Sequence, residues 1–273
     1  MLPVPILTYH ATNVDGNDYS SNDHVAFAHD LRMIDSLGYR IVPLGLVVDA
    51  LLHQSGLPDQ AVAITFDDGT DFDYYDLPHA THGLQRSMMN VMRDFIAELG
   101  ADRQPRMHAT TFVVVSPAAR EEMDRKCLTG SNWYRDTWWK PAVASGLLAV
   151  ANHSWDHNHA AVTSTSGRPA ADTFRCIDHR DLADLEIRQA RDYIDAVAPN
   201  AAAGLFAYPY GETNDYLLDE YFPLGESVTG ARAAFGTQPG HVAPGANRWH
   251  LPRYVCGANW HTPEDLTYLL HSA

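Results

Sequence analysis

The stretch AVAITFDDG, residues 61–69, decides the fold class. Its first six residues are apolar apart from Thr65, so apolar and polar side chains do not alternate along it. That pattern is typical of a strand covered on both faces, as in a parallel sheet flanked by helices. Two carboxylates, Asp67 and Asp68, follow at the carboxyl end of the predicted strand, where such folds collect their functional groups.

Further runs of this kind extend the pattern along the whole chain. The predicted strands are Val4–Tyr9, Arg40–Val42, Ala61–Phe66, Ala109–Val115, Leu147–Ala151 and Leu205–Tyr208. Apolar residues at helical spacing lie between them, on segments that include 27–37, 84–99 and 182–194. This alternation predicts an α/β fold with a parallel sheet or barrel. Neither a repeat nor a linker interrupts the sequence, so we expect a single domain over residues 1–273.

Two segments depart from this alternation. Residues Thr70–Pro105 carry few strand signals and many aromatic and acidic side chains, which predicts an insertion near the functional site. The second segment, Thr129–Lys140, contains Trp133, Tyr134, Trp138 and Trp139. It is either a loop clamped by buried aromatic side chains, the interpretation we favour slightly, or a stacking platform for a sugar ring.

Composition argues against several classes of function. The 19 Lys and Arg stand against 34 Asp and Glu, a formal net charge of −15, which disfavours nucleic acid or an anionic membrane as a partner. No apolar run is long enough for a membrane span and no leader precedes the first strand, so we expect a cytoplasmic protein. The three cysteines form no CxxC pair, whereas the 15 His favour metal or acid–base chemistry.

The first candidate site is the tripeptide Asp67-Asp68-Gly69. Adjacent carboxylates after a buried strand repel each other, and a cation bound to one of them would relieve that repulsion. Asp-Asp-Gly is also good turn chemistry. On these three residues alone, a turn is the better interpretation.

The second candidate site is the sequence NHSWDHNH at residues 152–159, after the fifth predicted strand. His153 and His157 are four residues apart, which on a helical turn would point both imidazoles to the same side. With one carboxylate of the first site they would form a three-ligand zinc site with a position open for water. His159 is a weaker candidate ligand, and Ser154 would hold the segment by local hydrogen bonding.

Together with a third motif, these segments resemble the polysaccharide deacetylase family, also called the NodB-homology family or carbohydrate esterase family 4. The three motifs are TFDDG at 65–69, HSWDH at 153–157 and FAYPYG at 206–211. The resemblance implies an irregular (β/α)7 barrel and metal-dependent hydrolysis of the acetamido group of an N-acetylated amino sugar or polysaccharide. Its implied partner is the N-acetylated saccharide, and its implied cofactor is Zn²⁺ or another divalent first-row ion.

The resemblance also assigns roles by position. Asp68, His153 and His157 would bind the metal, and Asp67 would act as the general base beside it. Tyr210 would offer its backbone N–H to the oxyanion that forms during hydrolysis.

One departure from the family pattern concerns the cation that orients the base. Many members carry an Arg before the Pro-Tyr-Gly segment, where this chain has Ala207-Tyr208. Arg253, in the stretch LPRY at 251–254, would replace it beside Asp67. The alternative is that Arg253 is a surface charge.

A second departure concerns the general acid, usually a His late in the chain. Here the sequence ILTYH at 6–10 resembles the opening of a permuted subgroup, typified by the deacetylases of poly-β-1,6-N-acetylglucosamine. In that arrangement His10 would be the acid, because first and last strands of a barrel are neighbours. The alternative acid is His271, in the helical segment Pro263–Ser272.

Other functions remain open on the sequence. The same motifs could serve an amidohydrolase or a deformylase that acts on a non-polymeric substrate. The fold could also belong to a catalytically inactive carbohydrate-binding protein, although binding alone would not require Asp67, Asp68, His153 and His157 together.

Overall fold

The computed structural model of the chain describes residues 3–128, 130–163 and 173–272. Its strands are β1 (Val4–His10), β2 (Arg40–Ile41), β3 (Ala61–Asp67), β4 (Leu77–His79), β5 (Gly83–Gln85), β6 (Ala109–Val113), β7 (Leu148–Asn152), β8 (Leu205–Ala207), β9 (Ala233–Phe235), β10 (His241–Val242) and β11 (Tyr254–Val255). Its α-helices are α1 (Asp23–Ser36), α2 (Leu44–His53), α3 (Met88–Leu99), α4 (Pro117–Cys127), α5 (Trp139–Ala144), α6 (Arg180–Ala183), α7 (Ala190–Val197), α8 (Glu226–Thr229) and α9 (Pro263–His271). A π-helical segment, Asp184–Gln189, joins α6 to α7. None of these described helices combines the length and apolar character that a bilayer crossing requires.

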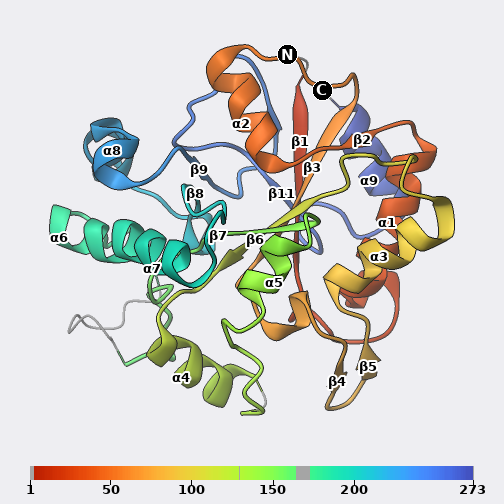
Figure 1. Cartoon of the computed structure of the whole chain (residues 1–273), viewed down its shortest axis with the longest axis horizontal. Coiled ribbons are helices and arrows are strands. Elements are labelled where there is room, and N and C mark those ends of the chain that lie inside the picture. The colour runs from red at the N-terminus through yellow and green to blue at the C-terminus, as the bar shows by residue number, and fades with distance from the viewer. Residues whose placement is uncertain (1–2, 129, 164–172, 273) are drawn as a thin grey trace.

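One curled sheet occupies the centre of the molecule, with strand order β10-β1-β3-β6-β7-β8-β9 (Figure 1). Neighbours from β1 to β9 along this path are parallel, and β10 pairs with β1 in the antiparallel direction. The helices surround the sheet in Figure 1, and the hairpin of β4 and β5 stands apart from it. The predicted α/β fold with a parallel sheet is therefore confirmed.

A short segment near the C-terminus spans the gap between the two ends of the parallel sheet. Leu251 forms a parallel bridge with Phe235 of β9, and β11 then pairs in parallel with β1. In the described part of the chain, seven parallel strands thus follow one another around a barrel-like sheet: β1, β3, β6, β7, β8, β9 and β11. The two-residue strand β2 also pairs in parallel with β3, off this path. This agrees with the irregular (β/α)7 barrel that the family resemblance implies, and with the single domain expected from the sequence.

Alternation along β3 separates an outer apolar layer from a partly polar interior. Ile64 and Phe66 belong to the buried cluster shared with α1 and α3, whereas Ala63 belongs to one shared with β6, β8 and β9. Because successive side chains of a strand point to opposite faces, Thr65 and Asp67 share the face of Ala63. The interior therefore becomes polar toward the carboxyl ends of the strands.

The six predicted strands are all present, with ends shifted by one or two residues. The predicted helical segments overlap α1 and the segment from α6 to α7, and the second of them contains α3. The expected insertion at Thr70–Pro105 is too long, because it includes α3, which belongs to the regular strand–helix alternation. This helix connects the paired strands β3 and β6 and packs on α1. Within that range, the β4–β5 hairpin is the part that lies outside the main sheet.

Candidate active site

Four candidate residues lie at the carboxyl end of the barrel, on different strands. His10 ends β1, and its register partner Asp67 ends β3. His153 follows β7, and Tyr210 lies in the turn after β8. All four line one cavity of about 470 Å³. Parallel strands bring these residues together because their carboxyl ends meet at the same edge of the sheet.

Asp68, His153 and His157 converge in this cavity. Oδ1 of Asp68 lies 3.7 Å from Nε2 of each histidine. Tetrahedral ligands about 2.1 Å from a shared ion would lie about 3.4 Å from one another. Within the described residues, these three are the one set of His, Cys, Asp or Glu whose ligand atoms, all within 4.8 Å of each other, could hold a metal ion. The donor atoms therefore fit Zn²⁺ or a similar divalent ion.

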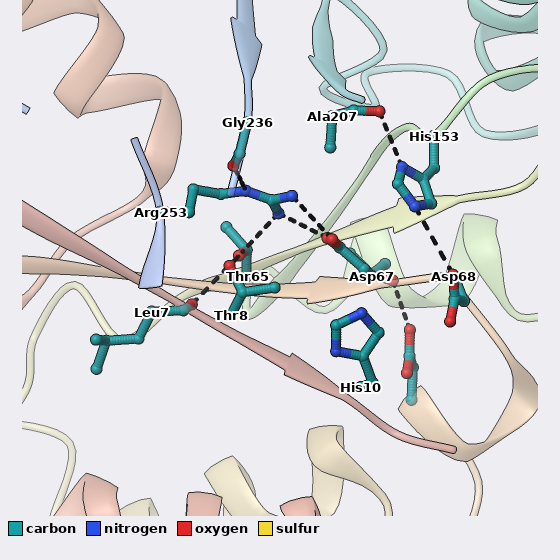
Figure 2. Close-up of polar contacts among 12 residues, drawn as sticks. Leu7, Thr8, His10, Thr65, Asp67, Asp68, His153, Ala207, Gly236 and Arg253 are labelled. Atoms are coloured by element: carbon teal, nitrogen blue, oxygen red, sulfur yellow. Dashed lines mark hydrogen bonds and ion pairs between the residues drawn. The ribbon is translucent and has the colours of Figure 1, made fainter. Parts of the chain in front are cut away.

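The backbone that carries the two histidines is a loop and not the predicted helical turn. Ser154 and His157 have φ angles of 72° and 62°, which a right-handed helix does not allow. The loop is closed by the local hydrogen bond expected of Ser154, whose Oγ accepts from the His157 N–H at 2.9 Å. The Nδ1 of His153 donates to the carbonyl of Ala207 at 2.9 Å, so its Nε2 faces Asp68 (Figure 2).

Burial favours the neutral form of the His157 imidazole, as a metal ligand requires. Desolvation lowers the pKa of His157 well below its usual range, and the neighbouring His153 adds to this effect. A histidine with a depressed pKa is neutral near pH 7, which is the form that binds a metal ion.

The backbone after β3 turns sharply at Asp68 and Gly69, with φ angles of 73° and 70°. A Cβ on Gly69 would lie 2.4 Å from Cγ1 of Val113 in β6, so only glycine fits at this position. The hydroxyl of Tyr134 donates to the Asp68 carbonyl at 2.8 Å. These contacts fix the backbone at Asp68, from which its carboxylate projects. Tyr134 is therefore a positioning residue. The sequence did not reveal this role, because no local sequence pattern around Tyr134 indicates a contact with Asp68, which is distant along the chain.

Asp67 is held by a buried ion pair. Nη1 and Nη2 of Arg253 donate to the two carboxylate oxygens of Asp67 at 2.7 and 2.8 Å (Figure 2). Nε of the same guanidinium donates to the carbonyl of Gly236 at 2.9 Å. Arg253 is fully buried, on the segment that spans the gap between β9 and β1. The alternative that Arg253 is a surface charge is therefore wrong.

The ion pair decides the charge of Asp67. Burial alone would raise the pKa of this carboxyl, but the guanidinium of Arg253, together with His153 and His10, outweighs burial and holds the pKa well below its usual range. Asp67 is therefore ionised near pH 7 and able to accept a proton from a neighbour.

The two candidate acids lie in different places. His10 lines the cavity, with its ring beside Asp67 in Figure 2 and its backbone N–H donating to Asp23 at 2.7 Å. His271 is exposed at the end of α9, where its Nδ1 bonds to the carbonyl of Thr267. The structure thus brings His10, and not His271, to the other candidate residues.

Tyr210 has φ and ψ angles of 59° and 8°, in the left-handed region that non-glycine residues rarely adopt. Its ring centroid lies 4.6 Å from that of His157. Strained backbone of this kind often marks a functional site. The turn places Tyr210 in the cavity wall, where the resemblance assigned its backbone an oxyanion-binding role.

The remaining candidate residues lie either in the cavity wall or in the protein interior. His159 lines the cavity, but it lies outside the group that could hold a metal. Trp138 and Trp139 are fully buried, as the favoured interpretation of a segment clamped by buried aromatic side chains requires, although Trp139 already belongs to α5 and not to a loop. Thr129, the first residue of that segment, lies outside the described residues. Trp133 is only partly buried.

Comparison with known families gives these residues a context. The family model described as polysaccharide deacetylase matches residues 54–226, more than half of the chain. The chain belongs to the polysaccharide deacetylase family. The match confirms the resemblance seen in the three motifs and contains all of them. His10 and Arg253 lie outside it. No curated protein matches this family member.

Several solved structures share the fold of this polysaccharide deacetylase. The deacetylase PplD from Streptococcus pyogenes, solved with acetate, is 18% identical with a TM-score of 0.66, and the match covers 99% of both chains. IcaB from Ammonifex degensii is 18% identical with a TM-score of 0.66 over 98% of this chain and 97% of its own. The BpsB deacetylase domain from Bordetella bronchiseptica is 16% identical with a TM-score of 0.63, over 93% and 96%. At these identities the likeness concerns the fold.

Proposed function

We propose that this polysaccharide deacetylase is a metal-dependent N-deacetylase that releases acetate from an N-acetylated amino sugar or polysaccharide. The observation that carries the proposal is the convergence of Asp68, His153 and His157 beside an ionised Asp67 in one cavity. A divalent ion bound there would polarise the acetamido carbonyl and lower the pKa of water.

The chain's own residues supply the proton transfers. Asp67, ionised and oriented by Arg253, would take the proton of the attacking water. The backbone N–H of Tyr210 would donate to the developing oxyanion, at no reorganisation cost because the turn is already formed. His10, on the neighbouring strand, would give its proton to the departing amine. Hydrolysis of an amide needs this last step because an amine leaves poorly without a proton.

The Arg253–Asp67 pair also bears on the alternative of an inactive carbohydrate-binding protein. The absence of an Arg before the Pro-Tyr-Gly segment would favour that alternative, but Arg253, which directly precedes β11, pairs with Asp67 instead. A buried, ionised carboxylate is costly to maintain, and saccharide binding alone gives no reason for it. Amidohydrolase and deformylase activities would use the same groups, so only substrates distinguish them.

The test is acetate release from N-acetylglucosamine oligomers by the zinc-loaded chain and by Asp67→Asn. We expect the variant to keep its bound ion, because Asp67 is not among the ligands, and to lose about 10²- to 10⁴-fold in turnover. Asp102→Asn, at an exposed position, is the control and should match the unsubstituted chain. Release of acetate by Asp67→Asn at the unsubstituted rate would refute the proposed role. Release of formate, or of acid from small amides only, would favour the alternative activities.

A further inference from the structure

The loop at residues 153–157, which carries both histidines of the candidate metal site, is bound by the segment that follows β6. The N–H of Val115 donates to the Ser154 carbonyl at 3.1 Å. The N–H of Ser116 donates to the Trp155 carbonyl at 2.6 Å. These two bonds use carbonyl groups of the loop, so its buried N–H groups need acceptors from another part of the chain.

Glu186 is the acceptor for two of these N–H groups. Its Oε2 accepts from the N–H of Trp155 at 3.1 Å and from the N–H of Asp156 at 3.3 Å. Glu186 is fully buried, in the π-helical segment Asp184–Gln189 between α6 and α7. Burial of a carboxyl group costs free energy unless hydrogen bonds compensate for the lost water. An apolar side chain would fill the same space at less cost, so packing alone does not explain Glu186.

A second contact joins the same π-helical segment to the start of the loop. Asn152, the last residue of β7, is almost fully buried, and its Nδ2 donates to the carbonyl of Ile187 at 2.8 Å. Its Oδ1 accepts from the N–H of Ser154 at 2.9 Å. The segment thus supports the loop through the side chain of Glu186 and the backbone of Ile187. Short π-helical segments are rare and occur frequently at functional sites.

The loop needs this support because its backbone is strained. Ser154, His157 and Asn158 have φ angles of 72°, 62° and 45°, in the left-handed region. Such conformations persist only where the surrounding structure holds them. The direction of an imidazole ligand depends on the backbone that carries it, and loss of a group that orients a ligand typically lowers metal affinity about 10- to 100-fold.

We propose that Glu186 is a positioning residue for the metal site, which holds the loop so that His153 and His157 face Asp68, and thereby sets the affinity for the ion. Glu186 is not among the residues that line the active-site cavity, so it would act only through the loop. This inference rests on the proposed function and deepens it, because it names a residue outside the cavity on which metal binding depends.

The experiment measures the dissociation constant for Zn²⁺ by competition with a chromophoric chelator, separately from acetate release. We expect Glu186→Leu, which is similar in size and has no acceptor, to weaken zinc binding about 10- to 100-fold. Glu186→Gln keeps an amide oxygen as acceptor and should stay within about 3-fold of the unsubstituted chain. With Co²⁺ in place of Zn²⁺, the visible absorption bands of Glu186→Leu should change, because they report the arrangement of the ligands.

Two further variants separate positioning from folding. If Glu186→Leu does not fold, Glu186→Asp shortens the side chain by one methylene and should weaken zinc binding about 3- to 10-fold. Leu266→Ala is the matched control for lost stability. Leu266 is fully buried in α9, which packs on α1, so its truncation should lower the melting temperature and leave the zinc affinity unchanged.

Unchanged zinc affinity in Glu186→Leu, or in Glu186→Asp where that variant replaces it, would overturn the positioning role. Equal weakening in Glu186→Leu and Glu186→Gln would also overturn it, because the acceptor oxygen would then be irrelevant. The same holds if Leu266→Ala weakens zinc binding as much as Glu186→Leu does. If the unsubstituted chain binds zinc but releases no acetate from any saccharide, the proposed function fails alone, and the affinities still decide the role of Glu186. Absence of zinc binding by the unsubstituted chain would overturn both.

Discussion

The pair formed by Arg253 and Asp67 is the most informative contact at the scale of single residues. Its two hydrogen bonds, at 2.7 and 2.8 Å, are made entirely within the protein interior. Such pairs add little net stability, but loss of one partner leaves a buried charge without compensation. The pair is therefore better explained by the chemistry of Asp67 than by folding.

Substitution of Arg253 tests this explanation. In Arg253→Met, Asp67 remains buried without its cation, and we expect the free energy of unfolding to fall by about 3 to 5 kcal/mol. Addition of Asp67→Asn should recover most of the stability and none of the acetate release. Urea unfolding and turnover of the two variants measure both effects. Recovery of activity in the double variant would show that Asp67 is not the base.

The choice between the two histidines is also a prediction at this scale. His10→Ala should lower kcat by about 10²- to 10⁴-fold, since the amine would then leave without a general acid. His271→Ala should keep the activity of the unsubstituted chain, because His271 is exposed on α9. Steady-state kinetics on the same saccharide decide the matter. The opposite result, with activity lost in His271→Ala and kept in His10→Ala, would show that His271 and not His10 is the general acid.

At the scale of elements, the long buried strands and the amphipathic helices were predictable from the sequence, because each carries its own periodic signal. Strands of two or three residues carry no such signal. The short strands β2 and β8 fell within predicted runs, whereas β9, β10 and β11 were missed. Arg253 lies next to β11, so its burial followed only from the pairing of that strand with β1. The loop geometry at His153–His157 was likewise hidden, because four-residue spacing suits both a helical turn and a tight loop.

A buried carboxyl links several elements and gives a pH prediction. Asp30 of α1 accepts hydrogen bonds from Tyr9 of β1, from Tyr19 and from Trp260, which precedes α9. Burial raises the pKa of Asp30 to about 6 in the folded chain, against 3.8 for an unperturbed Asp. The folded state then binds more protons between these two values, so the free energy of unfolding falls as pH rises through this window.

The size of this effect is about 3 kcal/mol, the equivalent of roughly two pKa units. Unfolding in urea at pH 4 and pH 7 should show this fall in the unsubstituted chain and a smaller fall in Asp30→Asn. The difference between the two slopes isolates Asp30 from other titrating groups. Identical pH dependence in both proteins would mean that Asp30 is not the buried titrating group.

The whole molecule combines an acidic surface with one polar cavity at the carboxyl end of its barrel. The net charge of −15 disfavours polyanionic partners and is compatible with a neutral acetylated sugar that becomes a cationic amine. The proposed reaction uses only a small part of the acidic and His content of the chain. The side chains concerned are Asp67, Asp68, His10, His153 and His157.

Metal titration of the whole enzyme tests the central claim most directly. The chain is stripped with a chelator and titrated with Zn²⁺ while bound ion and acetate release from an N-acetylglucosamine oligomer are measured together. The account predicts that activity is lost on stripping and returns in proportion to bound ion up to about one per chain, and that Asp68→Ala neither binds nor recovers. Undiminished acetate release from the stripped chain, or full activity of Asp68→Ala, would contradict it.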